Sequence, residues 1–398
     1  MKIALACPAS LPATQFGGIL FLAVDIAKKL SNLGHDITIY TTDLDFANNA
    51  STFNKKLPRV EHVENFKICR SHTYFSIRLF YINPGMYFKL KKDKPDLIHS
   101  IGVRSFQTLL ATLVSIREKI PLVISDQGGL TTHPDLRTSN FFHRMLFKLQ
   151  MPIVRFVVNH ARLVIVANEY EKNIFSEFCN SSKIEIVRNG IDKNITNLAK
   201  INFKEKYHIS SEFILFLGRF HKVKGIDVLL QSISIIKETL RDLNTKLVIM
   251  GVDFGFESEM LQMIKDLQIS DVVIVIKNPP RQDVLNAYNE SKFLVLPSRW
   301  ELSPLTPLEG FAFKKTVIST NVHGIPYTIN DGQNSILVSS ENANLIGSAI
   351  IALLHDPTKC SEYGENGYRL VHEICNSDNM VKHILEFYEK IIRTVDHK

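Results

Sequence analysis

The chain alternates short, β-branched apolar runs with helix-length amphipathic stretches, and it does so in two successive series. This alternation is typical of parallel α/β units, in which a helix connects each strand to the next. The predicted strands of the first series are Lys2–Ala6, Asp36–Tyr40, Leu97–His99, Pro121–Ser125, Leu163–Ala167 and Ile184–Arg188. Those of the second series are Phe213–Leu217, Lys246–Met250, Val272–Ile276, Phe293–Leu296, Thr316–Ser319 and Ile336–Val338. We therefore predict an α/β fold with two doubly wound domains in series.

The boundary between the two series is the turn-forming tetrapeptide Asn189–Asp192, followed by a polar stretch to about residue 208 that is expected to connect the domains. A chain of 398 residues is long enough for two domains of ordinary size, predicted at 1–195 and 205–375. A last helix, at about 379–393, can pack on either of them. Ligands of doubly wound folds bind at the carboxyl ends of the strands, so a cleft between the two sheets is the expected binding site.

Apolar runs and cysteines argue against a membrane-spanning or secreted protein. The apolar runs are of strand length, far short of the roughly 20 residues that a membrane-spanning helix needs. The five cysteines are scattered without metal-binding or disulfide spacing. Asp43 and Asp45 imitate a metal-binding carboxylate pair, but solvent contact or turn formation is the preferred interpretation. We predict a cytoplasmic protein with no bound metal and no cofactor.

Positive charge is concentrated in the first half, where residues 1–195 contain 25 Lys/Arg and 16 Asp/Glu. Two segments there combine basic with apolar or aromatic residues, Lys89–Lys94 and the helical stripe of Phe141–Ala161. Core packing explains the stripe more readily than membrane contact does, yet such segments also suit anionic lipid. We predict peripheral contact with an anionic membrane face, and no nucleic-acid binding, because no recognised motif accompanies the charge.

Two cations lie just beyond a predicted strand of the second series. Phe213–Leu217 leads into a loop that carries Arg219 and Lys224, and a helical apolar pattern follows. Two permanent cations at the carboxyl end of a strand are suited to holding a diphosphate. The competing interpretation is two solvated surface charges.

Two carboxylates, Glu301 and Glu309, follow the buried run at Phe293–Leu296. A helix is predicted to start at Thr306 or the next residue, so the backbone amides around Leu305 and Thr306 would form an anion site at a helix N-terminus. Thr306 and Glu309 also match a capping box, which would give Glu309 a structural role instead.

Taken in order, these motifs resemble the retaining nucleotide-sugar glycosyltransferases of the group 1, or family-four, type. That family includes glycogen synthases of bacterial type, sucrose synthases and phosphatidylinositol mannosyltransferases. Further matches are the glycine loop Gly17-Gly18, the strand Pro95-Asp96-Leu97-Ile98-His99 and the ending Asn189-Gly190-Ile191-Asp192. The resemblance implies the GT-B fold, with two Rossmann-like domains facing across a cleft, the first binding the acceptor and the second the nucleotide sugar.

The resemblance also implies roles for individual residues. Arg219 and Lys224 would neutralise the donor diphosphate, Glu301 would contact the donor sugar, and Glu309 would bind the ribose hydroxyls. The catalytic candidates are thus Arg219, Lys224 and Glu301. The donor-binding set adds Glu309 and the backbone at Gly17, Gly18, Leu305 and Thr306. The family retains anomeric configuration by same-face displacement, a reaction that needs neither a metal nor a side-chain base.

Two departures from the family pattern keep alternatives open. Leu302 stands where the family has glycine, and Gln127 stands where many members have histidine. Asp126, Gln127 and His99 are candidates for contact with the sugar or the acceptor, which the resemblance suggests is a glycan, polysaccharide or lipid-linked molecule. A nucleotide-sugar epimerase of the same architecture and a non-catalytic accessory protein remain the alternatives.

Overall fold

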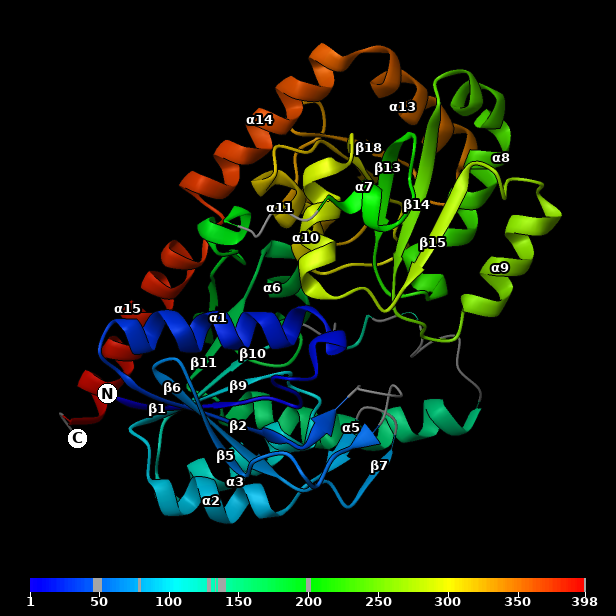
Figure 1. The fold of residues 1–398 in the computed structure, drawn as a ribbon. Helices are drawn as coiled ribbons and strands as arrows, with labels where there is room; N and C mark the ends of the chain where they lie inside the picture. The colour runs from blue at the N-terminus through cyan, green and yellow to red at the C-terminus, as the bar shows by residue number, and fades with distance from the viewer. Residues whose placement is uncertain are drawn as a thin grey trace. The chain divides into compact units, whose positions relative to one another are not determined.

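The computed structural model describes residues 1–45, 52–77, 80–126, 130–132, 134, 141–197 and 202–396. The chain forms two compact units (Figure 1). The first unit is Met1–Asn189 together with Ser377–Lys398, and the second unit is Gly190–Asn376. Each unit is built on one large, mainly parallel sheet, which confirms the predicted α/β class.

The sheet of the first unit has eight strands in the order β12-β11-β10-β9-β1-β2-β6-β5. Six of them lie where the sequence predicts strands: β1 (Lys2–Ala6), β2 (Asp36–Thr42), β9 (Leu97–Ile101), β10 (Leu122–Ser125), β11 (Leu163–Val166) and β12 (Ile184–Ile186). These six pair in parallel. Their side chains are mostly buried, as expected for a sheet covered by helices on both faces.

Two further strands extend this sheet and were not predicted. β6 (Phe66–Ser71) pairs in parallel with β2, and β5 (Val60–Val63) pairs with β6 in an antiparallel direction. Lys67 and Arg70 interrupt the apolar pattern of β6, and Arg70 is nevertheless buried. Two small hairpins were also missed: β3 (Leu44–Asp45) with β4 (Thr52–Phe53), and β7 (Phe75–Ile77) with β8 (Phe80–Ile82).

Helices cover both faces of this sheet (Figure 1). On one face lie α1 (Gly18–Asn32) and α15 (Ser377–Asp396), whose Leu22, Ile26, Met380, Ile384 and Tyr388 share one core with the strands. On the other lie α2 (Gly85–Asp93), α3 (Phe106–Glu118) and α5 (Phe141–His160), while α6 (Glu169–Ser176) follows β11. The last helix, α15, therefore belongs to the first unit although it follows the second unit in the chain.

The sheet of the second unit has six parallel strands in the order β15-β14-β13-β16-β17-β18. All six were predicted: β13 (Glu212–Leu217), β14 (Thr245–Gly251), β15 (Val273–Lys277), β16 (Leu294–Leu296), β17 (Val317–Thr320) and β18 (Ser335–Val338). The strand order reverses between β13 and β16, which makes their carboxyl ends the topological switch point where doubly wound sheets bind ligands.

Eight α-helices of the second unit lie in its described part, which leaves out residues 198–201: α7 (Phe203–Lys206), α8 (Ile226–Asp242), α9 (Glu257–Asp266), α10 (Arg281–Glu290), α11 (Leu305–Ala312), α12 (Ile325–Thr328), α13 (Ala343–His355) and α14 (Pro357–Glu373). The first of these corrects the expectation of a polar connection up to residue 208. Phe203 of α7 is fully buried in the core of the second unit, so this stretch is part of the fold.

Candidate functional site

The loops that leave β13 and β16 meet at the switch point of the second unit. Gly225 ends the turn after β13 with φ +67°, a left-handed conformation that favours glycine. A Cβ at this position would lie 2.0 Å from the carbonyl oxygen of Pro297. Glycine is therefore required for the loop carrying Lys224 to approach the end of β16.

A pocket lies at this point, lined by Lys224 from the first loop and by Ser298, Glu301 and Thr306 from the second loop and α11. Lys224 Nζ donates to Glu301 Oε1, and the hydroxyl of Ser298 donates to the same oxygen at 3.0 Å. Both charged side chains keep 17% of their surface exposed. The structure thus brings together two predicted site residues as a mutually neutralising pair that a ligand can still reach.

Arg219 follows the same strand as Lys224 but is held differently. Its guanidinium lies over the ring of Phe254, 4.9 Å from the ring centre, and Phe254 belongs to the loop that follows β14. A cation over an aromatic face is attracted by the ring electrons. Arg219 is thereby held half-buried at the end of β13.

Helix α11 corrects the predicted capping box. The helix begins at Leu305 after Pro304, so Glu309 lies within the helix rather than at its third position. No side chain caps this helix, and Thr306 in its first turn lines the pocket. Backbone N–H groups of a first turn lack partners within the helix and carry partial positive charge, which suits an anion.

Glu309 is almost fully buried, and its carboxylate is held by two residues that sequence reasoning missed. Arg281 donates to both carboxylate oxygens, at 2.5 and 3.1 Å, and the hydroxyl of Tyr288 donates at 2.9 Å. Burial and the nearby Glu309 carboxylate raise the pKa of Tyr288 well above its ordinary value. In the sequence, Arg281 can be recognised only as a cation at the start of a predicted helix. That position does not show that Arg281 pairs with Glu309.

Among the first-unit candidates, the glycine pair lies at a helix start. Gly17 is the N-cap of α1 with φ +97°, and Gly18 is the first residue of that helix. A Cβ at Gly17 would meet nothing within 4 Å, so the left-handed backbone rather than crowding favours glycine there.

His99 and Asp126 are buried and bonded to the protein itself. The Nδ1 of His99 lies 2.5 Å from the Tyr388 hydroxyl oxygen, and its Nε2 lies 3.1 Å from Ser125 Oγ. Burial lowers the pKa of His99 to about 3, so its ring is neutral at physiological pH. The two carboxylate oxygens of Asp126 accept from the backbone N–H groups of Val103 and Leu130.

The two departures from the family pattern have different outcomes. Leu302 is 4% exposed and packs inside the second unit. Gln127 lies outside the described residues.

The sequence interpretation of Asp43 as a solvated or turn carboxylate is wrong. Asp43 is fully buried, forms an ion pair with Arg59 and lies within hydrogen-bonding distance of His72 Nδ1. Across the described ranges, no group of three or more His, Cys, Asp or Glu side chains is placed to hold a metal ion. In the same part of the chain, no helix combines the length and the apolar character needed to cross a membrane.

Comparisons with known proteins agree with this geometry. Residues 199–370 match the family model "Glycosyl transferases group 1", and residues 16–194 match "Glycosyltransferase Family 4". The capsular polysaccharide biosynthesis glycosyltransferase CapM of Staphylococcus aureus is 25% identical over 79% of this chain and 81% of its own length. The N-acetyl-alpha-D-glucosaminyl L-malate synthase of Bacillus anthracis is 23% identical over 99% of this chain and 98% of its own.

The fold also matches solved structures. The Anabaena protein HepE, in complex with UDP and glucose, superposes with a TM-score of 0.78 at 16% identity, over 98% of this chain and all of that chain. The two parallel sheets are thus those of the GT-B architecture, as predicted. Two family models that together span most of the chain, a pocket at the switch point and this fold agree: the chain is an enzyme that transfers sugars, and it belongs to the group 1 glycosyltransferases.

Proposed function

We propose that the second unit binds a nucleotide-diphosphate sugar and that the enzyme transfers its hexose to an acceptor with retention of anomeric configuration. The observation that carries this proposal is the switch-point pocket, where Lys224, Glu301 and the uncapped start of α11 lie together. A cation and a helix N-terminus suit a diphosphate, and a carboxylate suits sugar hydroxyls.

The chemistry follows from these groups. The bond between the anomeric carbon and the diphosphate oxygen breaks while an acceptor hydroxyl forms the new bond on the same face. The hydroxyl proton passes to the departing phosphate oxygen. Arg219, Lys224 and the amides of Leu305 and Thr306 stabilise the charge that develops on the diphosphate, which is the term that such preorganised groups supply. This reaction requires no metal and no side-chain base.

Glu309 is proposed to bind the ribose. Arg281 and Tyr288 orient its carboxylate, which fixes its oxygens before the ligand arrives. Each carboxylate oxygen has two lone pairs, so a carboxylate that already accepts three bonds can still accept from a hydroxyl.

The comparisons supply the first ligands to test. HepE is described in complex with UDP and with UDP-glucose, which makes UDP-glucose the first donor to try. The named relatives act in capsular polysaccharide biosynthesis and in the synthesis of a glucosaminyl malate. Glycan acceptors and small anionic acceptors are therefore both candidates for the first unit. His99, Asp126 and Gln127 were expected to contact the sugar or the acceptor there, whereas the backbone at Gly17 and Gly18 was expected to hold the donor.

Thermal stability tests the donor site. Purified protein is heated with UDP, GDP, ADP and their common sugar conjugates, with Glu309→Ala alongside. A ligand at 100 times its dissociation constant stabilises by about 2.7 kcal/mol, a visible shift. A shift with one nucleotide that the variant loses supports the site; no shift with any nucleotide contradicts it.

Analysis of the reaction product distinguishes a retaining transferase from the alternative functions. Incubation with the stabilising donor and candidate acceptors, followed by NMR of the anomeric proton, reports the configuration of the product. Retention supports the proposed mechanism, and inversion removes it. Conversion of the donor sugar without an acceptor would favour an epimerase, and binding without turnover would favour an accessory protein.

Peripheral membrane contact is proposed as a second property of the first unit. The apolar stripe of α5 divides: Val154 and Val157 are buried, whereas Met145 and Leu149 are exposed, Leu149 by 64%. Phe156, which lies outside the stripe, is also exposed. Exposed apolar side chains beside basic ones favour an anionic interface. Salt-sensitive sedimentation with anionic liposomes, reduced by Leu149→Ser, is the expected result; no sedimentation would remove the idea.

A further inference from the structure

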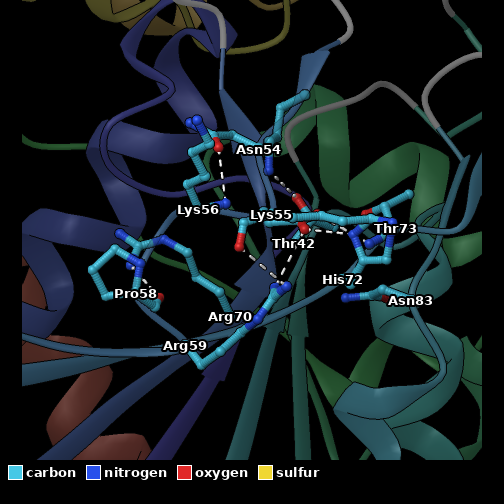
Figure 2. Close-up of polar contacts among 12 residues, drawn as sticks. Thr42, Asn54, Lys55, Lys56, Pro58, Arg59, Arg70, His72, Thr73 and Asn83 are labelled. Carbon is cyan, nitrogen blue, oxygen red and sulfur yellow. Dashed lines mark hydrogen bonds and ion pairs between the residues drawn. The ribbon is translucent and has the colours of Figure 1, made fainter.

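A second charged site lies in the first unit, where β2 and β6 end side by side. Thr42 at the end of β2 is the register partner of Ser71 at the end of β6, so Asp43 and His72 follow at the same edge. Asp43 is fully buried, and Figure 2 shows the residues at this edge, among them Arg59, His72 and Thr73. Burial of a carboxylate is costly unless donors surround it.

Three donors surround Asp43. The backbone N–H of Thr73 donates to Oδ1 at 3.0 Å, while His72 Nδ1 lies 2.6 Å and Arg59 Nη1 lies 3.3 Å from Oδ2. Since an ionised carboxylate only accepts, Nδ1 of His72 carries a proton. The other ring nitrogen, Nε2, points away from the carboxylate. One buried anion thus orients an imidazole and a guanidinium at once.

The segment that carries Arg59 is fixed to the same strand ends. Asn54 donates from its backbone N–H to the carbonyl of Asp43 at 2.8 Å and from its side chain to Asp45 at 2.8 Å. The buried guanidinium of Arg70 donates to the carbonyl of Pro58 at 3.0 Å. These bonds hold the turn of residues 54–58 beside Asp43 (Figure 2).

The side-chain donors of this site reach the surface, whereas its central anion does not. Arg59 is 41% and His72 22% exposed, and the turn adds the exposed Lys55 and Lys56. The nearby acids are engaged: Asp45 accepts from Asn54, and Glu61 pairs with Arg70. Arg59, Lys55 and Lys56 are thus the exposed cations of this edge, and the nearby acids already have partners.

Two buried hydroxyls next to His72 add an independent observation. Ser71 Oγ and Thr73 Oγ1 have no hydrogen-bond partner among the described residues, and both side chains are almost fully buried. Hydroxyls in such positions are normally satisfied, since an unmet hydrogen bond costs about 1–3 kcal/mol. A buried water molecule is the partner that such groups normally have.

We infer that this strand end, formed by Asp43, Arg59, His72 and the Lys55-Lys56 turn, binds an oxyanion carried by the acceptor, a phosphate or a carboxylate. The inference rests on the proposed function, in which the first unit receives the acceptor. Asp43 acts as the buried positioning residue. Arg59 contacts the anion, and His72 contacts it through Nε2 when both ring nitrogens carry a proton.

Histidine NMR on the full-length protein tests the site directly. The protein is labelled with ¹⁵N-histidine, and the signals that disappear in His72→Gln identify that ring, with exposed His62→Gln as the matched control. Inorganic phosphate and then acetate are titrated. We expect a saturable shift of the His72 signals, with affinity about tenfold weaker in Arg59→Gln, since a charged hydrogen bond is lost. The matched variant Arg117→Gln, at an exposed arginine of α3, keeps the affinity of the unmodified protein.

Absence of any shift at His72 with either anion would overturn the inference, as would equal affinity in Arg59→Gln and Arg117→Gln. Vesicles of phosphatidylglycerol, compared with phosphatidylcholine, identify the source of the anion: a shift at His72 with phosphatidylglycerol assigns a lipid phosphate, and a shift with free anions alone assigns a soluble one. Because His72 reports on the first unit and nucleotide stabilisation on the second, failure of this site and failure of the donor site are distinguishable.

Discussion

The two units use the ends of similar parallel strands in different ways. At the switch point of the second unit, Lys224 and Glu301 remain partly exposed and line a pocket. In the first unit, His99 within β9 and Asp126 just after β10 are buried and bonded to the protein. In the same architecture, polar side chains can therefore stay accessible to a ligand or form bonds within the protein that stabilise the fold. In the first unit, accessible cations gather instead at the ends of β2 and β6.

The largest expected effect is a loss of turnover when cations at the switch point of the second unit are removed. Arg219→Ala and Lys224→Ala should each lower kcat by about 10²–10³, because each removes a group that stabilises the leaving diphosphate. Lys222→Ala is the matched control, since Lys222 is 63% exposed and pairs with Glu259. Initial rates with the stabilising donor provide the measurement. Turnover near that of the unmodified enzyme in both variants would refute the site.

Nucleotide affinity tests the cluster around Glu309. Glu309→Gln should weaken binding about tenfold or more, because it removes a charged acceptor and leaves Arg281 without its carboxylate. Tyr288→Phe removes one hydroxyl from the same carboxylate and should weaken binding by only a few-fold. Calorimetric titration measures both. Equal affinity in all three proteins would show that Glu309 is structural.

Stability tests the buried anion of the first unit. Asp43→Asn should cost about 1–3 kcal/mol, since three donors lose their charged acceptor. Lys67→Gln, which breaks the exposed pair with Asp36, should cost less than about 1 kcal/mol. Hydrogen exchange of β2 and β6 amides follows this unit separately. A smaller loss in Asp43→Asn than in Lys67→Gln would remove the idea that Asp43 organises this edge.

The pH dependence of stability tests the buried polar groups of the first unit. Glu171 is buried in α6, and burial raises its pKa to about 8. Its folded pKa thus exceeds the unfolded value, so the stability it contributes is complete below pH 4.5 and is lost as pH rises through 8. From pH 7 to 8 the protein should lose about 1 kcal/mol that Glu171→Gln retains. Urea unfolding at both pH values measures this, with exposed Glu169→Gln as control; parallel behaviour of all three proteins would contradict it.

Local sequence patterns predicted most strands of the two sheets, because an apolar run of strand length can be recognised without knowing which strand it pairs with. β6 escaped because Lys67 and Arg70 break its pattern, and Arg70 is buried only by virtue of acceptors at Pro58, Leu11 and Glu61. Strand burial that depends on such distant partners is invisible in a local window.

In the candidate site, too, local features were predictable and features that depend on distant partners were not. The placement of Lys224 and Glu301 was predictable, because each follows a predicted strand by a few residues, whereas their expected roles came from the family resemblance. The capping box at Thr306 and Glu309 failed, because the helix begins at Leu305 and the carboxylate is held by Arg281 and Tyr288 from another helix. A choice between a local and a distant partner is decided by tertiary packing.

The placement of α15 has a consequence for the order of synthesis. This helix completes the core of the first unit, yet the ribosome makes it after the whole second unit. Until then His99 lacks Tyr388, and the face of the sheet beneath Met380 and Ile384 stays uncovered. The second unit can fold while the first unit still exposes apolar surface. The unit that is translated first is therefore the one that completes its folding later.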